Sequence, residues 1–386
     1  MGSILLKKMN GYVEKTDLNF EEITEWDESI FKNLISLDLR DDQVEQVLTP
    51  PIVYSNHQDV LAVHWHPEHV PMELIKKRIG IMFPVRKSEL IIPTQHNVLM
   101  ENDGYCGVEV DCYSRGFGAK VQLLLHFEKS KVENAEILKS MLSHTFKYRS
   151  SQLFDFIETI VNPERQEALQ EAAGETGAND EVVEFTKNVS KKLKGMLEKY
   201  ESITPAESVK NKLLSNYVDT MRGAIGDRFA NRVQLFLKAV KIIVKRNFPL
   251  YYFYRVNEII EEVRGLGGGV VIPHPEQFWP ILLAGYDVDG YEVWNPQSRR
   301  YTEFLINVVN NQNKTIKATS KPVLIFMGDD THMGEKTKDP KFQNREKAGR
   351  EIGFQPAWEE LMTSKSLIAG NISKASLITE YRARLS

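Results

Sequence analysis

The chain contains 386 residues, enough for one large elaborated domain or two domains of ordinary size. Its 42% of hydrophobic and 26% of charged residues are typical of a soluble globular protein. Because 49 Lys and Arg face 53 Asp and Glu, the net charge is −4, and this balance argues against a protein that coats DNA or anionic lipid.

The cysteine content and the hydropathy narrow the class of protein further. The only cysteines are Cys106 and Cys112, which excludes a disulfide scaffold or a cysteine-rich zinc module and suits a reducing cytosol. No apolar run approaches the roughly 18 residues that a transmembrane helix needs. The first residues, MGSILLKKMNGYVEK, lack the apolar core of an export signal because charges interrupt them. We therefore predict a cytoplasmic protein with no membrane partner.

Residues 1–55 are predicted to form an N-terminal extension, acidic and mixed in composition, that contains one or two helices and closes at Pro50-Pro51. From residue 56 to 128, short apolar or β-branched runs alternate with polar loops and with helical patterns such as 71–79. The strand-like runs are 59–63, 89–92, 107–110 and 121–125. This rhythm is typical of β/α units and predicts a mainly parallel sheet or barrel.

Residues 129–255 are predicted to form a helical insertion, because several segments carry apolar residues at i, i+3, i+4 spacing. Between two of these segments, residues 164–181 are rich in Glu, Ala and Gly and are predicted to be a flexible loop. The basic stripe of Lys238, Lys241, Lys245 and Arg246 could grip a phosphate backbone, although a solvated helix face is favoured.

The β rhythm returns over residues 256–340, where the segments GLGGGVVIPHP, GYEVWNP and KPVLIFMGDDTHMG occur. Residues 341–386 show weaker helical patterns and are predicted to be a C-terminal tail. The strand-like segments therefore flank the helical ones, which predicts an α/β domain with a large insertion.

Histidines are the most informative residues, because seven of the nine lie at or just beyond the end of a strand-like run. They are His64, His66, His69, His96, His126, His274 and His332. In parallel β/α architectures the carboxyl ends of the strands converge on one face, so side chains that are far apart in sequence can meet. Neutral imidazole is a common metal ligand, and a cluster of imidazoles is hard to explain without a cation.

Carboxylates accompany these histidines. His64 and His66 can point the same way, since side chains alternate along a strand, and such a pair can chelate one ion. Glu109, in CGVEVDC, follows a short apolar run, and a carboxylate can bridge two ions. Asp330 lies two residues before His332, at another strand end. The pattern as a whole predicts a metal site.

These motifs, in this order, resemble those of the PHP family, named for polymerase and histidinol phosphatase. VHWH resembles the family's opening H-x-H, PTQHN its T-D-H-N, GVEV its G-[IV]-E, and LLLH the His at the next strand end. GGGVVIPHP resembles the Gly-Gly…His-Pro motif, GYEVWN the Glu-Val-x-Asn strand and GDDTH the closing G-S-D-A-H. The resemblance covers about 150 residues, roughly 57–128 and 256–336.

The resemblance implies a metal-dependent phosphoesterase on a distorted (β/α)7-type barrel built from residues 56–128 and 256–340. It implies one ion surrounded by His64, His66, Glu109 and Asp330. Glu109 would bridge to a second ion held by His126 and His274, and a third ion would take His96, His332 and, as a candidate, His69. The implied cofactor is thus two or three divalent ions, and the ligand types suit Zn, Fe or Mn.

We therefore expect hydrolysis of a small-molecule phosphate ester by a metal-activated water, without a side-chain nucleophile. Arg115, Arg299 and Arg300 lie in loops after the relevant strands and are the candidate substrate-binding residues. Two alternatives stay open. The helical insertion would suit a single-strand nuclease or phosphodiesterase, although the negative net charge disfavours nucleic acid as a partner. Ala62 replaces the Asp that the family usually has two residues before the first His, which would suit a catalytically lapsed metal-binding scaffold.

Overall fold

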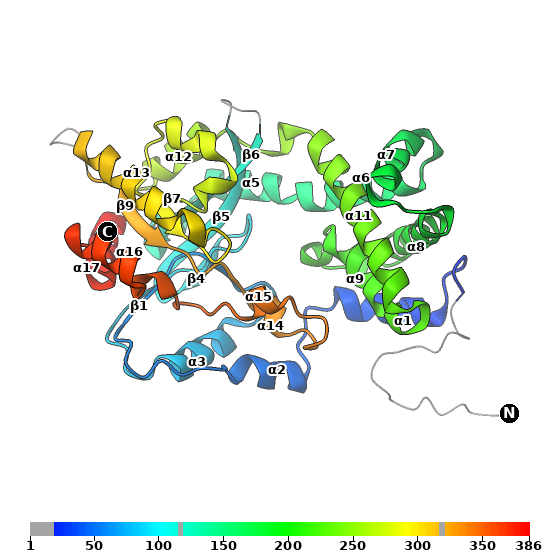
Figure 1. The fold of residues 1–386 in the computed structure, drawn as a ribbon, viewed down its shortest axis with the longest axis horizontal. Coiled ribbons are helices and arrows are strands. Elements are labelled where there is room, and N and C mark those ends of the chain that lie inside the picture. The colour runs from blue at the N-terminus through cyan, green and yellow to red at the C-terminus, as the bar shows by residue number, and fades with distance from the viewer. Residues whose placement is uncertain (1–18, 115–118, 316–320) are drawn as a thin grey trace. The chain divides into compact units, whose positions relative to one another are not determined.

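The computed structural model describes residues 19–114, 119–315 and 321–386. These residues form two compact units (Figure 1). A helical unit contains residues 19–37 and 147–249, and an α/β unit contains residues 38–146 and 250–386 apart from the two internal gaps. No helix in the described ranges is both long and apolar enough to cross a membrane.

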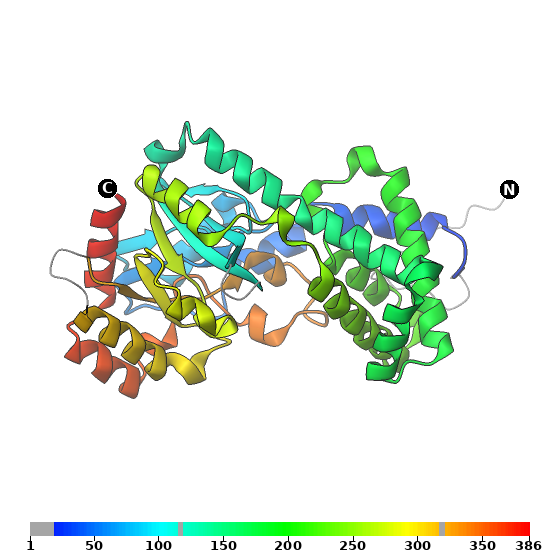
Figure 2. The same cartoon turned by 90° about the horizontal axis from the view of Figure 1, so that it is seen from above.

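The helical unit packs its helices around one apolar core (Figures 1 and 2). Its helices are α1 (Glu25–Ile35), α6 (Tyr148–Val161), α7 (Gln166–Thr176), α8 (Asp180–Lys199), α9 (Lys212–Thr220), α10 (Arg222–Ile225) and α11 (Asp227–Asn247). The largest buried side chains of this core are Phe31, Phe156, Tyr217 and Phe236. Lys238, Lys245 and Arg246 are exposed on α11, as predicted for a solvated face.

The prediction of a flexible loop over residues 164–181 is wrong, because α7 and the start of α8 occupy this stretch. α7 ends at Gly177, whose φ of 65° places it in the left-handed region, and Asn179 caps α8 by accepting from the backbone N–H of Val182. Only Leu169 and Ala172 are buried on α7, so its apolar periodicity is sparse. Glu, Gln and Ala nevertheless favour a helix, and they make up most of it.

The described residues of the α/β unit form three separate sheets. β1 (Asp59–Ala62) pairs in parallel with β3 (Ser88–Ile91), and β2 (Trp65–His66) pairs in parallel with β10 (Thr331–His332). The third sheet has the order β4-β5-β6-β7-β8-β9. Its strands are β4 (Met100–Asn102), β5 (Tyr105–Ser114), β6 (Ala119–Glu128), β7 (Gly269–Ile272), β8 (Gly290–Trp294) and β9 (Leu324–Met327).

The described strands do not close into the expected (β/α)7-type barrel, and the large sheet is mixed rather than mainly parallel. The pairs β4–β5, β5–β6 and β6–β7 are antiparallel, whereas the pairs β7–β8 and β8–β9 are parallel. Only four residues separate β5 from β6, and a parallel pair needs a crossover of a dozen residues or more. The short connection therefore forces an antiparallel pair, and the structure establishes a mixed α/β fold.

Both faces of the six-stranded sheet are covered (Figure 1). One face packs against α5 (Glu136–Phe146), α12 (Val256–Gly265) and α13 (Thr302–Thr315), and the other against β1, β3 and α17 (Lys374–Leu385). Side-chain alternation along β6 places Leu123 and Leu125 in the first layer and Leu124 in the second. Burial of both faces explains why β6 is a nearly continuous apolar run.

Short helices complete the α/β unit. They are α2 (Asp41–Leu48), α3 (Met72–Met82), α4 (Lys129–Val132), α14 (Met333–Lys336), α15 (Arg345–Ala348) and α16 (Leu361–Ala369). The C-terminal residues, predicted to be a tail, form α15, α16 and α17, and Tyr381 and Leu385 are fully buried in the layer beneath the sheet. These residues are therefore part of the core around the candidate site.

Candidate metal centre

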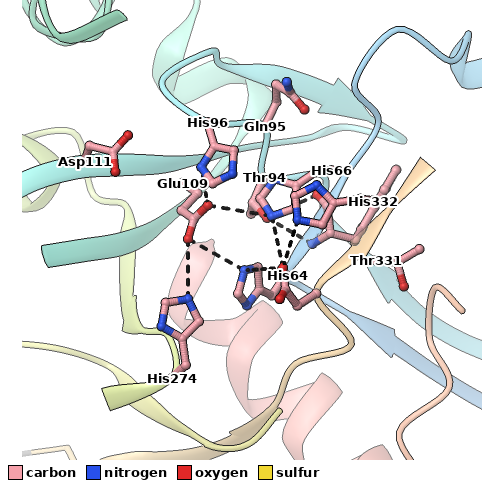
Figure 3. Close-up of polar contacts among 12 residues, drawn as sticks. His64, His66, Thr94, Gln95, His96, Glu109, Asp111, His274, Thr331 and His332 are labelled. Carbon is pink, nitrogen blue, oxygen red and sulfur yellow. Dashed lines mark hydrogen bonds and ion pairs between the residues drawn. The ribbon is translucent and has the colours of Figure 1, made fainter. Parts of the chain in front are cut away.

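Strand pairing brings the histidines of distant segments together. His66 on β2 lies opposite His332 on β10, and their ring centroids are 4.3 Å apart. His96 forms an isolated bridge with Glu109, and its ring also stacks against His66, with 4.4 Å between the ring centroids; the rings of His96 and His332 are 6.0 Å apart. Three imidazoles from segments that are up to 266 positions apart therefore cluster, and those of His96 and His332 each stack against His66 (Figure 3).

Seven of the predicted ligand residues gather into three overlapping groups (Figure 3). The groups are His66 with His96 and His332, His64 with Glu109 and His274, and His64 with His66 and Asp330. In each group one potential ligand atom per residue lies within 4.8 Å of the others. The groups share His64 and His66, so ions held by them would lie side by side.

The separations between these side chains match the spacing of metal ligands. His66 Nε2 and His332 Nε2 each lie 3.4 Å from Asp330 Oδ1, and His64 Nε2 and His274 Nε2 each lie 3.7 Å from Glu109 Oε1. N–H···O hydrogen bonds are typically 2.7–3.2 Å long, so these distances are too long. Two atoms that each lie about 2.1 Å from a tetrahedral ion are about 3.4 Å apart. The spacing therefore fits a shared cation better than direct hydrogen bonds.

Unsatisfied buried atoms point to the same conclusion. His64 Nε2 and both ring nitrogens of His66 are buried and have no hydrogen-bond partner among the described residues. A buried polar atom without a partner costs about 1–3 kcal/mol, and native structures contain few of them. Imidazole nitrogens and carboxylates are ligands for divalent transition metals, so the donor set fits such ions.

Glu109 lies where a bridging ligand would be placed. Its Oε1 faces His64 and His274, both at 3.7 Å, whereas its Oε2 lies 2.5 Å from His96 Nδ1 and 3.6 Å from His66 Nε2. The two oxygens of one carboxylate thus face two different groups of imidazoles. Glu109 is 1% exposed, so water does not satisfy them.

The two carboxylate oxygens of Asp330 have different partners. Oδ2 accepts hydrogen bonds from Arg350 Nη1 at 2.6 Å and Gln297 Nε2 at 2.8 Å, which leaves Oδ1 facing the histidines. Asp330 also has a φ of 46°, which is uncommon for a residue other than glycine. Its backbone N–H donates to the carbonyl of His64, and its carbonyl accepts from Arg350. Buried donors therefore hold this strained residue in place.

Electrostatics set the protonation states of the cluster. Burial opposes ionisation of Asp330, but the polar contacts with the His332 and His66 imidazoles and the charge of His64 hold its pKa well below the usual range. Burial, together with the charges of His332 and His96, lowers the pKa of His66 to about 3. Near neutral pH the carboxylate is thus charged and the His66 imidazole is neutral, which are the forms that bind metals.

His64 differs from His66 in its carboxylate partner. Burial disfavours its charged form, but the charge and hydrogen bond of Glu292 outweigh burial and raise the pKa of His64 to about 10. An ion bound at Nε2 would compete with the proton there. The Nδ1 proton is separate, because Nδ1 lies 2.7 Å from Glu292 Oε1.

The structure does not bring His126 into any of the three groups. Its Nε2 lies 2.9 Å from the carbonyl of Val63 and its Nδ1 lies 2.7 Å from the hydroxyl of Tyr381, so both ring nitrogens are engaged. The strand direction explains this placement. β6 is antiparallel to β5 and β7, so its carboxyl end lies beside the amino ends of those two strands, next to Gly107 and Gly269. The second ion that the resemblance assigns to His126 would lack this ligand.

His69 is also outside the three groups among the described residues. Its Nε2 lies 3.2 Å from Thr337 Oγ1. The neighbouring Glu68 lies closer to the cluster, with Oε1 3.4 Å from His332 Nδ1, and it has a φ of 53°. Sequence reasoning missed Glu68, although its place two residues after His66 is a usable signal.

The predicted substrate-binding arginines have other contacts or lie outside the described residues. Arg299 is largely exposed and pairs with Glu360 at 2.7 Å. The Arg300 guanidinium lies over the ring of Tyr301, 4.7 Å from its centroid. Arg115 belongs to the stretch 115–118, which the structure does not describe.

Comparisons with known proteins add a distant likeness. No profile of a known family matches the chain, and no curated protein sequence matches it. Among solved structures, the chain is similar to a protein of Bifidobacterium adolescentis that is proposed to be a metal-dependent phosphoesterase. The identity is 15%, the match covers 81% of this chain and 97% of that one, and the TM-score is 0.39.

Proposed function

We propose that this protein is a metal-dependent phosphoesterase of the PHP type, acting on a phosphate ester at a centre of two or three divalent ions. One observation carries the proposal: Glu109 places one oxygen 3.7 Å from both His64 and His274, and the other 3.6 Å from His66 and 2.5 Å from His96. A bridging carboxylate between two sets of imidazoles is an arrangement that binds adjacent cations.

The residues of the three groups would hold the ions, with Glu68 as an additional ligand beside His332. The imidazoles favour Zn²⁺ or Fe²⁺, and the carboxylates also suit Mn²⁺. When bound, such ions supply Lewis acidity, which acidifies water and neutralises the charge of a phosphoryl group.

The chain's own residues prepare the site for this chemistry. Glu109 and Asp330 are buried and stay ionised, so they offset the positive charge that the site collects. His66 stays neutral and keeps a lone pair available. Arg299 and Arg300 lie a few residues beyond Gln297, which contacts Asp330, and this proximity in sequence supports a role for them in holding substrate phosphate.

The test is a joint assay of metal content and hydrolysis. The full chain is purified without chelator, its ions per chain are measured, and it is assayed on a panel of phosphomonoesters, phosphodiesters and single-stranded DNA. We expect two or three ions and hydrolysis of at least one small phosphate ester. The double variant His64→Ala, His66→Ala should lose both, whereas His144→Ala, a histidine of α5 bonded to the Tyr251 carbonyl, should keep both.

Two results would reject the proposal. The first is less than one ion per chain after exposure to Zn²⁺, Fe²⁺ and Mn²⁺. The second is hydrolysis that the double variant retains. Full occupancy without turnover on any substrate would instead identify a metal-binding scaffold, and turnover of DNA alone would identify a nuclease.

A further inference from the structure

Glu292 is a buried carboxylate that stands behind the candidate ligands without belonging to any of the three groups. It lies in the middle of β8, is 1% exposed, and β8 runs between β7 and β9. His274 follows β7, and the loop with Asp330 follows β9. Glu292 is thus placed between the segments that carry two of the ligands.

The two oxygens of Glu292 contact two ligands of the same group. Oε1 lies 2.7 Å from His64 Nδ1, and Oε2 accepts a hydrogen bond of 2.8 Å from the backbone N–H of His274. The Asn295 side chain also donates to Oε2, at 3.3 Å. One carboxylate therefore fixes a side chain from one segment and the backbone of another.

The contact with His64 determines which ring nitrogen is available to an ion. With Nδ1–H donating to Glu292, the lone pair of His64 is on Nε2 once that atom is deprotonated. Nε2 is the atom that faces Glu109 and Asp330, at 3.7 Å from each, and it has no hydrogen-bond partner among the described residues. Carboxylates that fix metal-binding imidazoles in this way raise the basicity of the ligand and orient its ring.

The contact with His274 holds a strained backbone. His274 has a φ of 29° and a ψ of 58°, an unusual conformation for a residue other than glycine. Such residues persist only where surrounding contacts hold them. A hydrogen bond from a backbone N–H to a buried carboxylate is of the stronger, charge-assisted kind.

Gly328 provides an independent observation. A Cβ atom at this position would lie 1.3 Å from Glu292 Oε1 and 3.1 Å from His64 Nδ1. The Gly328 backbone N–H donates to the carbonyl of Trp294, so the close approach of β8 to this loop is part of the fold. Only glycine leaves room for the carboxylate against His64.

We propose that Glu292 is the positioning residue of the His64–Glu109–His274 group and sets its affinity for a divalent ion. The inference rests on the proposed function, because it presumes that this group binds a cation. Within the described residues, the only ion-pair partner of Glu292 is the His64 imidazole. A purely structural carboxylate would be expected to pair with a cation outside the candidate ligands.

Asp289 is such a structural carboxylate and serves as a matched control. It immediately precedes β8, and its Oδ2 accepts from the backbone N–H of Val270 at 2.8 Å, much as Glu292 accepts from His274. Unlike Glu292, it pairs with two arginines, Arg264 at 2.6 Å and Arg384 at 3.6 Å. Asp289→Asn should therefore weaken the fold without affecting the ligands.

The experiment compares the wild-type chain with Glu292→Gln, Gly328→Ala and Asp289→Asn. Zn²⁺ affinity is measured by competition with a chromogenic chelator, Co²⁺ is titrated by its visible spectrum, and unfolding of the metal-free chains is followed by circular dichroism. We expect Glu292→Gln to weaken one ion by about 10–100-fold and to change its Co²⁺ bands. Gly328→Ala should change the same ion in the same direction, whereas Asp289→Asn should bind like the wild type.

Each outcome of this experiment either supports or rejects the positioning role of Glu292. Wild-type affinity and spectrum in Glu292→Gln would overturn this inference while leaving the metal centre intact. An equal loss in Asp289→Asn would also overturn it, since metal loss would then follow stability alone. If Glu292→Gln does not fold, Gly328→Ala decides by the same criterion. A wild-type chain that binds no ion would instead reject the proposed function.

Discussion

Each of the two units buries a cluster of polar side chains, and the two clusters differ in how well their polar atoms are paired. In the helical unit, Asp27 is fully buried, yet its carboxylate pairs with Lys192 at 2.6 Å and accepts from the Tyr217 hydroxyl and the Thr24 side chain. In the α/β unit, equally buried His64 and His66 face the Glu109 carboxylate at 3.7 and 3.6 Å, beyond the length of a hydrogen bond. The two clusters are equally buried, but the polar atoms of the first have hydrogen-bond and ion-pair partners, whereas several polar atoms of the second have none within the described residues.

This difference indicates that the cluster of the helical unit stabilises the fold, whereas the cluster of the α/β unit is suited to bind an ion. A satisfied polar cluster specifies how the helices pack and requires nothing else. A cluster of unsatisfied imidazoles and carboxylates is costly in an isolated chain, and a bound cation would remove the cost. All nine histidines lie in the α/β unit, so the chemistry is concentrated in one of the two units.

The largest expected effect follows from breaking the bridge in the α/β unit. Glu109→Gln removes the carboxylate that faces both sets of imidazoles, so at least one ion should be lost and hydrolysis should fall by more than about 100-fold. Metal analysis and steady-state kinetics measure the two losses. Glu101→Gln, at an exposed carboxylate paired with Lys129, is the control and should behave like the wild type. Retention of all ions by Glu109→Gln would show that it is no bridge.

The converse change breaks the satisfied cluster of the helical unit. Lys192→Met leaves the buried Asp27 carboxylate without its cation, and losing one partner of a buried pair typically costs about 3–5 kcal/mol. Urea unfolding should show this loss, while ions per chain and turnover stay at wild-type values below the transition. A parallel loss of metal in the folded variant would contradict the separation of the two roles.

Acid should destabilise the α/β unit through His126. Burial lowers the pKa of His126 to about 4, below the 6.5 of an unperturbed histidine. The neutral form is thus favoured on folding, so this contribution is complete above about pH 6.5 and is lost as the pH falls toward 4, up to about 3 kcal/mol. Denaturant unfolding of chelated protein at several pH values measures it. His126→Gln should show a shallower dependence, and an unchanged slope would contradict the assignment.

The smallest expected effect concerns Arg350, which holds Asp330 from outside the ligand groups. Arg350→Met removes the donors to Asp330 Oδ2 and to its carbonyl, and should weaken metal binding by about tenfold. Glu346 contacts the same guanidinium at 3.1 Å but is largely exposed, so Glu346→Gln is the control. Chelator competition measures both, and equal affinities in the two variants would exclude an orienting role for Arg350.

Much of the site follows from one rule about strand ends, and its failures follow from strand direction. The rule brings together His64, His66, His274 and Asp330. The strands near them run in parallel pairs, β2 with β10 and β7 with β8, so their carboxyl ends lie on the same side. The rule fails for His126 because β6 is reversed, and a reversed strand has the same local sequence pattern as a forward one. The reversal of β6 also makes the large sheet mixed, and the described strands do not close into the expected barrel.

The supporting residues could not be predicted from local sequence. Arg350 comes from the segment predicted to be a tail, and nothing in its neighbours indicates that it would reach Asp330. Glu292 lies in GYEVWN, a motif that marks the strand but not the partners of its carboxylate. Helix α7 escaped prediction because polar residues dominate it. Contacts between segments that are distant in the sequence depend on the tertiary fold and cannot be predicted from local sequence patterns.

Anomalous X-ray scattering from crystals grown with Zn²⁺ or Mn²⁺ tests the central claim most directly, because it locates the ions themselves. We predict difference peaks on both sides of the Glu109 carboxylate, one within about 2.2 Å of His64 Nε2 and another beside His66. A map without peaks there, with the imidazoles and carboxylates instead hydrogen-bonded directly to one another, would contradict the proposed metal centre.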